Sequence, residues 1–354
     1  MSSRRKTKSS EQQLKTVKRL KRFVTTIEVI LGLLIVMMAV ILFVPSVKTQ
    51  VVKAMANTAI GQKIITWWGN NSYNESVRDL NFDDGSIKTN KLKYNYSEEY
   101  TNFVLFGVDS RDHDDTGRSD ALMIMSVDKM HGKIKLTSIA RDTRVYISDR
   151  GSYDKIAHAY AYGGPEMSIK TINQNFNTNI KEYVTVNFDQ LATVINSLGG
   201  VTLTITEEER VSANENIAAL GTGTPIRQSG TVLLTGEQAV GYARIRKIDS
   251  DNMRAQRQRN VLNAIFEQMK GKSSLEYAEF IRQLLPNVET SLDYGDLMGL
   301  ATIMFGSVTM EELSFPNENS NARGGIFYSD GAWYYEYDLD VASQQLHQFI
   351  YEDE

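Results

Sequence analysis

A chain of 354 residues is long enough for one large domain or two ordinary ones, and its formal net charge is −4 at pH 7. Residues 1–22 hold nine Lys and Arg against one Glu, or +8, so the remaining residues together carry −12. This acidic remainder argues against a nucleic-acid-binding domain, which would present a net basic face. The absence of cysteine agrees, as a weak signal, with an exported bacterial domain that uses no disulfides.

The basic tail is followed by the strongest apolar run of the chain, residues 23–44. A membrane-spanning helix needs about 20 apolar residues, and cations before such a span orient the N-terminus to the cytoplasm. A cleaved signal peptide is the alternative, but its apolar core is usually shorter than this run. No small-x-small cleavage pattern follows at residues 45–48 either. We therefore predict a cytoplasmic tail (1–22), a retained transmembrane helix (23–44) that anchors the chain in the cell membrane as a single pass, and an extracytoplasmic remainder.

The extracytoplasmic part is predicted to contain a stalk or linker, residues 45–98, and a catalytic domain, residues 99–354. The linker assignment rests on polar residues with Asn-Asn and Asp-Asp-Gly breakers between 70 and 95. Short apolar runs typical of buried strands, and longer runs with helical spacing, alternate in the domain. Strands are predicted at 103–108, 121–127, 134–139, 201–205, 310–315 and 327–337, and helices at 168–176, 188–198, 256–269, 275–285, 294–305 and 338–351. The mixture predicts an α/β (α+β) fold in which a mixed central β-sheet is flanked by helices.

Two aspartates mark the ends of the first two predicted strands. Asp109 follows the first strand and Asp120 opens the second, so a hairpin would place both carboxylates at the same end of the sheet. The third strand would bring Arg141 to that end, where Arg118 already lies. Two carboxylates beside arginines suit an oxygen-ligated Mg²⁺, with Mn²⁺ as an alternative ion, that bridges to a phosphate. Asp-rich loops with glycine are also common as plain turns, and strand parity alone leaves both interpretations open.

The densest cationic segment lies between residues 244 and 259, where six cations accompany two carboxylates. Converging arginines would bind a highly charged oxyanion such as a pyrophosphate, because each guanidinium donates two parallel hydrogen bonds. In a helix that starts near residue 253, Arg254 and Gln258 continue the buried stripe toward the N-terminus, which itself favours an anion. Arg244 and Arg246 alternate as in a strand, so both side chains would face one way.

A solvated basic face is the competing interpretation of this segment, with salt bridges to Asp249 and Asp251. The helical phase predicts such a surface position for Arg257 and Arg259.

A third segment, residues 155–164, offers Lys155 for a phosphate and a Gly-Gly pair that would allow close approach of the backbone. Its lone histidine, His158, is the kind that is more often structural. The sequence has no serine-hydrolase elbow, no Gly-rich phosphate loop ending in Lys-Ser/Thr and no metalloprotease histidine pair.

In this order, over about residues 100–270, these segments resemble the LytR–CpsA–Psr family of bacterial cell-envelope proteins. Ala140 departs from the proline that the family often has there, and the last 80 or so residues carry no motif that can be matched. The matching stretches are Phe106–Arg111 (FGVDSR), Arg118–Asp120 (RSD), Ser138–Thr143 (SIARDT), Lys155–Tyr160 (KIAHAY), Leu198–Val201 (LGGV), Leu234–Ala239 (LTGEQA), Tyr242–Arg246 (YARIR), and Asp251 with Arg254, Arg257 and Gln258.

The resemblance implies a membrane-anchored phosphotransferase that moves an anionic glycopolymer, such as teichoic acid or a capsular polysaccharide, from an undecaprenyl-pyrophosphate carrier to peptidoglycan. The polyprenyl tail would lie in an apolar groove between sheet and helices. The implied site consists of Asp109 and Asp120 as metal ligands, Arg118, Arg141, Arg244, Arg246, Asp251 and Arg254 as catalytic residues around the pyrophosphate, and Arg111, Lys155 and Gln258 as substrate-binding residues. No residue stands out as the general base, for which Asp142 and Asp251 are candidates.

Two rival functions keep parts of this prediction. In one, water attacks and the protein is a polyprenyl-pyrophosphate hydrolase. In the other, the protein is a non-catalytic envelope sensor or regulator that binds polyprenyl phosphates. Nucleic acid is not an expected partner in any of them.

Overall fold

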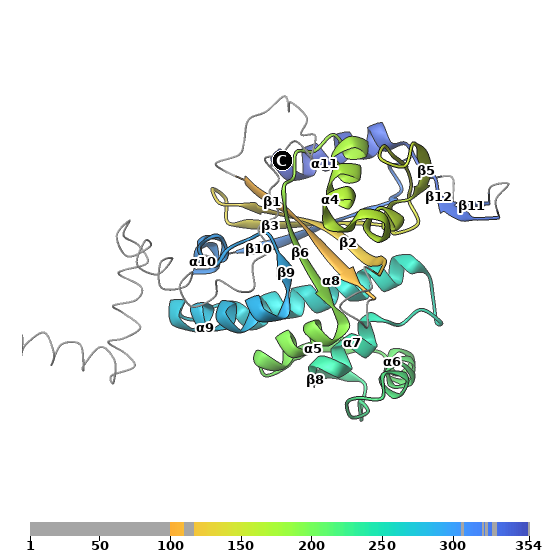
Figure 1. The fold of residues 1–354 in the computed structure, drawn as a ribbon. Coiled ribbons are helices and arrows are strands. Elements are labelled where there is room, and N and C mark those ends of the chain that lie inside the picture. The colour runs from red at the N-terminus through yellow and green to blue at the C-terminus, as the bar shows by residue number, and fades with distance from the viewer. Residues whose placement is uncertain are drawn as a thin grey trace, which may run out of the picture. The chain divides into compact units, whose positions relative to one another are not determined.

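A six-stranded mixed sheet lies at the centre of the fold, in the strand order β10-β3-β2-β1-β6-β9 (Figure 1). The computed structural model describes residues 100–109, 117–305, 308–320, 322, 325–327 and 331–352, all within one compact unit. Two antiparallel hairpins join β1 to β2 and β2 to β3, whereas β6 and β10 pair in parallel with β1 and β3. The strands are β1 (Tyr100–Val108), β2 (Ser119–Asp128), β3 (Lys133–Ile139), β6 (Glu182–Asn187), β9 (Glu289–Thr290) and β10 (Thr309–Phe315).

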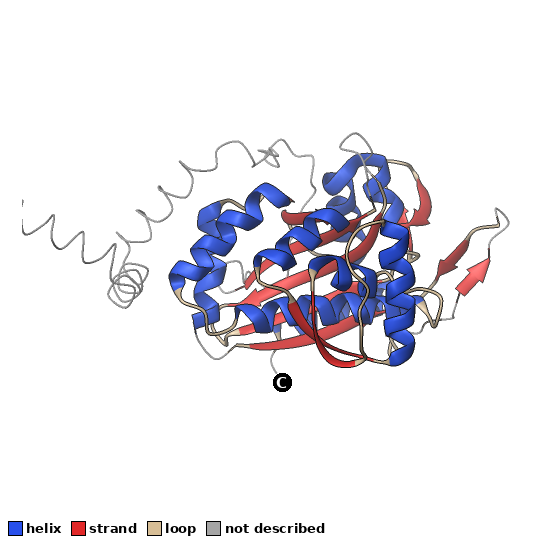
Figure 2. Ribbon diagram, turned by 90° about the horizontal axis from the view of Figure 1, so that it is seen from below, coloured by secondary structure: helices blue, strands red, loops and turns tan. Residues whose placement is uncertain are grey.

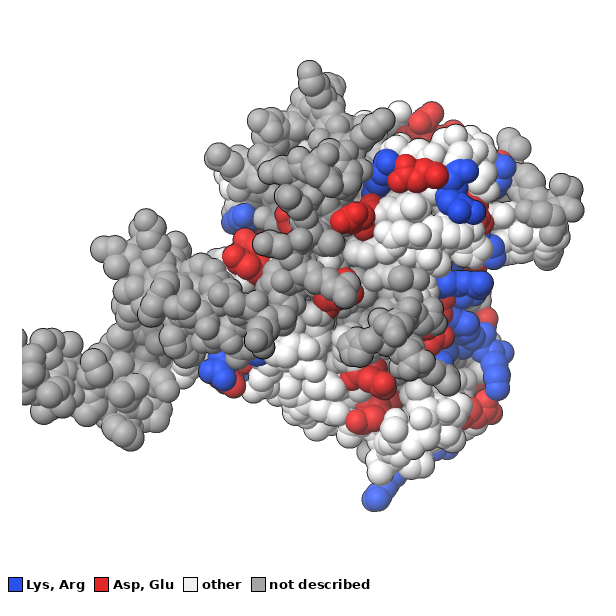
Figure 3. All heavy atoms as spheres, in the orientation of Figure 1, with Lys and Arg blue, Asp and Glu red and all other residues white. Residues whose placement is uncertain are grey.

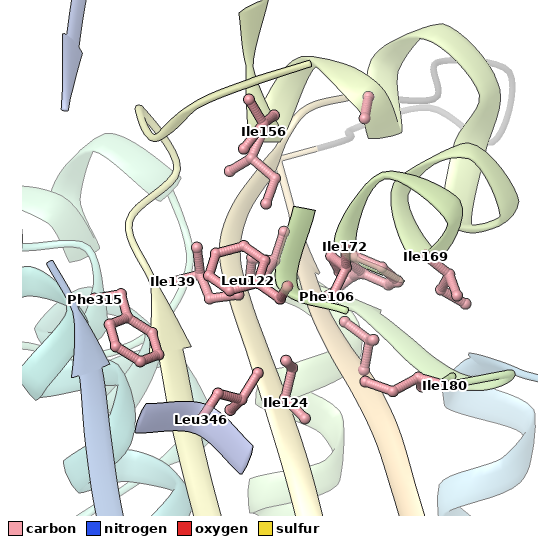
Figure 4. Packing of buried hydrophobic residues seen from close by; sticks show 14 of the residues in the cluster. Phe106, Leu122, Ile124, Ile139, Ile156, Ile169, Ile172, Ile180, Phe315 and Leu346 are labelled. Carbon is pink, nitrogen blue, oxygen red and sulfur yellow. The ribbon is translucent and has the colours of Figure 1, made fainter. Parts of the chain in front are cut away.

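Helices cover both faces of this sheet (Figures 1 and 2). One face packs against α4 (Ile156–Phe176) and α11 (Leu339–Tyr351). Phe106, Leu122 and Ile172 belong to the apolar cluster between them, which Figure 4 shows. On the other face lie α5 (Phe188–Ser197), α7 (Gly236–Ala243), α8 (Asp251–Met269), α9 (Ser274–Leu284) and α10 (Tyr294–Ala301). The predicted fold class, a mixed sheet flanked by helices, is therefore confirmed for the described residues.

Smaller elements extend the ends of this framework. Three two-stranded sheets pair β4 (Arg144–Ile147) with β5 (Ser152–Lys155), β7 (Val201–Ile205) with β8 (Gly230–Leu234), and β11 (Gly325–Phe327) with β12 (Trp333–Tyr335). The remaining elements are α6 (Glu207–Leu220) and two 3₁₀ helices, η2 (Leu285–Asn287) and η3 (Thr302–Phe305).

Helix α4 differs from its prediction because it begins at Ile156, about a dozen residues before the helix expected at 168–176. A kink at Gly163 and Gly164 joins its two parts, and Gly164 has φ +63°, which glycine adopts without steric cost. Pro165 then opens the second part, where its fixed φ is already helical. The Gly-Gly pair, expected to let the backbone approach a ligand, serves instead as the bend of this helix.

The predicted membrane helix, residues 23–44, lies outside the described residues. Among the residues that the structure describes, no helix is long and apolar enough to cross a membrane.

Close packing of α7 on α5 depends on the lack of a side chain at Gly236. A Cβ placed on Gly236 would lie 2.0 Å from the carbonyl oxygen of Ala192. We expect Gly236→Ala to lower the free energy of unfolding by about 2–3 kcal/mol, because backbone must move to relieve the overlap. Urea unfolding of this variant is compared with that of Gly299→Ala in α10. A Cβ added at Gly299 would have no atom within 4 Å outside its chain neighbours and its own helix backbone. Alanine there should stabilise the helix by up to about 1 kcal/mol, and equal midpoints for the two variants would contradict the close packing.

Candidate active site at the carboxylate and arginine cluster

Asp120 owes its position to an irregularity in the β1–β2 hairpin. The register pairs Gly107 with Ala121 and Val108 with Ser119, so Asp120 falls between paired residues as in a β-bulge. Bulges re-aim side chains, and this one directs Asp120 to the end of the sheet. Asp109 follows β1 at the same end, where its backbone N–H donates to the carbonyl of Arg118 at 3.4 Å. The strand-parity prediction is thus confirmed: both aspartates lie at one end of the sheet.

Three arginines converge on Asp120. Arg141 Nη1 donates to Asp120 Oδ1 at 2.7 Å, Arg246 Nη2 donates to Oδ2, and Arg254 Nη2 donates to the Asp120 carbonyl at 3.1 Å. The Asp120 side chain is 12% exposed, and Arg254 is 4% exposed. Burial by itself would raise the pKa of Asp120, but the charge of Arg246, the hydrogen bond from Arg141 and the charge of Arg254 outweigh burial and lower it. Asp120 is therefore ionised, and arginines from three separate segments donate to it.

Asp142 is a second carboxylate that contacts this cluster. Its Oδ2 accepts from Arg141 Nε at 3.3 Å, and its Oδ1 lies 2.6 Å from Nζ of Lys155. Lys155 is the N-cap residue of α4, so the predicted third segment does reach the site through this lysine. Each oxygen of Asp142 thus already contacts a cation, which disfavours Asp142 as the group that contacts the acceptor hydroxyl.

Arg244 and Arg246 do not lie on the predicted strand. Arg244 is the C-cap residue of α7, and its guanidinium lies 4.3 Å from the ring centroid of Phe188. Arg246 follows in the exposed connection to α8 and extends to Asp120. The expected strand alternation is therefore wrong. The sequence contained a signal for the helix, since Thr235 and Gln238 form a capping box at its start.

Figure 3 shows basic side chains gathered at the edge of the molecule where, in the orientation of Figure 1, the connection between α7 and α8 lies. Of the other predicted site residues, Arg118 is exposed. Asp251 is the first residue of α8. Arg111 lies outside the described residues.

The predicted surface position of Arg257 and Arg259 is wrong. Arg257 is 2% exposed and donates to Glu209 at 2.9 Å and to Asp249 at 3.0 Å. Arg259 is 6% exposed and donates to Glu312 at 2.8 Å. Helical phase assumed a single buried stripe, but the partner carboxylates come from α6, from the connection before α8 and from β10. These elements cover α8 on additional sides.

Two cavities meet at Asp120. A polar cavity of about 250 Å³ is lined by Arg141, Arg254 and Arg259 among others, and an apolar groove of about 100 Å³ runs along the sheet. Asp120 and Gln258 line both. The residues that make the groove apolar are Leu105, Gly107, Ala121, Met123, Val186, Phe188, Leu191, Ala243, Val261 and Leu262. An apolar groove therefore exists between the sheet and the helices, as expected.

The profile of the LytR_cpsA_psr family matches residues 67–349, four-fifths of the chain. The chain belongs to this family. A teichoic acid transferase named TagU from Bacillus mycoides is 31% identical over 268 residues, which cover 75% of this chain and 81% of that protein. TagT from Bacillus subtilis, named polyisoprenyl-teichoic acid–peptidoglycan teichoic acid transferase, is 30% identical over 264 residues, covering 73% and 80% of the two chains.

Solved structures of family members share the fold. TagT bound to LI-WTA aligns with a TM-score of 0.59 and 27% identity, over 73% of this chain and 94% of that chain. A family protein, YwtF (TagT), with bound octaprenyl pyrophosphate lipid aligns with a TM-score of 0.55 and 25% identity, over 73% and 93% of the chains.

Asp109 and Asp120 are the carboxylates of this LytR–CpsA–Psr protein that suit a metal ion at the end of the sheet. Among the described residues, no group of three or more His, Cys, Asp and Glu side chains is close enough to hold a metal. Mg²⁺ needs fewer, since one or two carboxylates usually combine with substrate phosphates and water. Asp109 and Asp120 supply these two donors at one sheet end, so the residues fit an ion that binds together with a phosphate.

Proposed function

We propose that this protein transfers an anionic glycopolymer from an undecaprenyl-pyrophosphate carrier to peptidoglycan. The observation that carries the proposal is the position of Asp120 and Gln258 between an apolar groove and an arginine-lined polar cavity. A polyprenyl pyrophosphate has both chemistries in one molecule, a long apolar tail and a highly charged head. The relatives TagU and TagT are named for this transfer.

The arginines of the site are suited to bind the pyrophosphate and to stabilise the transferring phosphoryl group. Guanidinium groups of Arg141, Arg246 and Arg254 already converge on one carboxylate and its carbonyl, so little reorganisation is needed to present them to phosphate oxygens. An acceptor hydroxyl oxygen bonds to the glycan-bearing phosphorus while the bond from that phosphorus to the bridging oxygen breaks. Polyprenyl phosphate leaves. Catalysis of such a transfer consists mainly of positioning and charge neutralisation.

A magnesium ion, with Mn²⁺ as an alternative, is part of the proposal, with Asp109 and Asp120 as its protein ligands. When bound, the ion would neutralise charge on the phosphate oxygens. The location is proposed as well: residues 23–44 anchor the chain in the cell membrane, with the N-terminus in the cytoplasm and the domain outside. The lipid carrier, the membrane and peptidoglycan are then all within reach of the site.

The deciding experiment incubates the full chain, in lipid nanodiscs with Mg²⁺, with a lipid-pyrophosphate glycan and a peptidoglycan oligomer. Covalent attachment of glycan to the oligomer supports the transferase. Release of free glycan phosphate without an attached product would favour a hydrolase. Tight binding of the lipid without turnover would exclude both enzymatic functions and favour a non-catalytic sensor or regulator.

The apolar groove provides a sharper test of lipid recognition. Val186 lines the groove from β6, and Val186→Phe would fill it. We expect binding of a polyprenyl pyrophosphate to weaken at least tenfold while binding of inorganic diphosphate stays unchanged, because the arginines are untouched. Calorimetric titration of both ligands measures the difference, and Val211→Phe on the exposed surface of α6 is the matched control. Equal losses for the two ligands would show that the groove does not hold the tail.

A further inference from the structure

A histidine and an aspartate form a hydrogen-bonded dyad across the start of α4. Asp154 Oδ1 lies 2.9 Å from Nδ1 of His158 and also accepts from the backbone N–H of Lys155 at 2.7 Å. The other oxygen, Oδ2, accepts from the hydroxyl of Tyr162 at 2.6 Å. Both oxygens of this carboxylate are therefore fixed, and it in turn fixes the orientation of the imidazole.

Asp154 stays ionised in these surroundings. Burial raises the pKa of Asp154, but the hydrogen bonds from Tyr162, His158 and the backbone of Lys155 outweigh burial and lower it. An ionised carboxylate next to Nδ1 favours the tautomer with the proton on that nitrogen. Nε2 of His158 then carries a lone pair, and the side chain is 24% exposed. This is the arrangement of a base oriented by a carboxylate.

Sequence neighbours of the dyad contact the arginine cluster. The backbone N–H of Ala157 donates to the carbonyl of Arg141 at 3.2 Å, and Lys155 is paired with Asp142. His158 thus directly follows Ala157, which contacts the backbone of Arg141, and the Arg141 side chain donates to Asp120. Arg118 interacts electrostatically with the hydroxyl of Tyr162.

The carboxylates closer to the proposed phosphate site already have cations on both oxygens. Asp120 holds the side chains of Arg141 and Arg246, and Asp142 holds Arg141 and Lys155. Among the described residues, the titratable group that contacts the dyad is Tyr162 of α4. Arg118 and Arg150 act on Tyr162, and the Arg150 guanidinium lies 4.5 Å from its ring.

We propose that His158, oriented by Asp154, is the general base that accepts the proton of the peptidoglycan hydroxyl. This inference rests on the proposed transferase function. The hydroxyl proton passes to Nε2 of His158 as the oxygen bonds to phosphorus, and the bond from phosphorus to the bridging oxygen breaks. Polyprenyl phosphate departs with that electron pair and needs no proton. The imidazolium then releases its proton to water, which restores the base.

The test uses the full chain with lipid-pyrophosphate glycan, peptidoglycan oligomer and Mg²⁺. General base catalysis contributes about 10²–10⁴-fold, so His158→Gln should lower the transfer rate by that factor while donor affinity stays unchanged. The fall of the rate at acidic pH should disappear in this variant. The chain offers a matched control in His131, whose Nδ1 lies 2.8 Å from Asp128 at the opposite end of β2. His131→Gln should transfer glycan at the wild-type rate.

Two further variants separate a catalytic from a structural role. Added imidazole should restore part of the activity of His158→Ala, because it replaces the base in the space that the side chain leaves. Asp154→Asn should lose activity, and combining it with His158→Gln should cost no more than the histidine change alone, since the two residues act as a unit. Failed rescue together with an unchanged pH profile would show that His158 is structural. If the wild type transfers glycan and His158→Gln remains within threefold of it, the inference is wrong and the transferase stands. If the wild type does not transfer glycan, the proposed function fails and the inference falls with it.

Discussion

Replacing Asp120 with asparagine is expected to lower glycan transfer at least 100-fold without weakening the binding of inorganic diphosphate in the absence of metal. The transfer rate falls because Asp120 is a proposed ligand of the metal that would neutralise charge on the phosphate oxygens. Removing one preorganised group from such a site typically costs about 10²–10³-fold. Metal-free diphosphate keeps its affinity or gains some, because a negative charge leaves a site that binds an anion.

Two measurements check this prediction. A transfer assay with Mg²⁺ gives the rate, and a titration with diphosphate in the presence of a chelator gives the metal-free affinity. The comparison is Asp109→Asn, which changes an exposed carboxylate at the same sheet end and should reduce the response to Mg²⁺. If Asp120→Asn lowers metal-free diphosphate affinity as much as it lowers transfer, Asp120 is a structural anchor alone and not a ligand of the metal.

Stability should show a matching pH dependence. The folded-state pKa of Asp120 is lowered, so its ion pairs stabilise the fold fully above the unfolded value of about 3.9. That contribution is lost as the pH falls through the lowered folded pKa. Wild type and Asp120→Asn should therefore differ in unfolding free energy at neutral pH and converge below about pH 4.

The parts of this site that the sequence could predict are those that follow from short-range patterns. Hairpin parity placed Asp109 and Asp120 together because apolar strand runs and a Gly-containing turn determine the direction of each strand. Parity could not show the bulge that turns Asp120 toward the arginines, because the bulge lies at the start of β2, where too few residues precede it to reveal a change in side-chain alternation.

Longer-range contacts explain what was missed. Phase on a helical wheel reports one buried stripe, whereas the burial of Arg257 and Arg259 depends on carboxylates 48 and 53 residues away in sequence, on α6 and β10. The role of His158 was equally hidden, since a histidine four residues after an aspartate is common and becomes informative only when α4 docks on Arg141.

Replacing Arg257 with methionine is expected to destabilise the fold strongly. Arg257 is 2% exposed and bridges Glu209 of α6 to Asp249, which precedes α8. Methionine keeps the apolar stem but leaves two largely buried carboxylates without their shared cation. Removing one partner of a buried pair costs about 3–5 kcal/mol, and the partial exposure of Asp249, 24%, places this case near the lower value.

The chain contains a matched control for this effect. Lys247, in the connection before α8, pairs with Glu215 of α6, but their side chains are 79% and 56% exposed. Exposed pairs contribute about 0–1 kcal/mol, so Lys247→Met should shift the urea midpoint only slightly. Because Arg257 also fixes the connection that carries Arg246, Arg257→Met should reduce diphosphate affinity along with stability, whereas Lys247→Met should leave stability nearly unchanged. Similar small midpoint shifts for the two variants would mean that α6 and α8 are held together by their apolar contacts and not by the buried arginine.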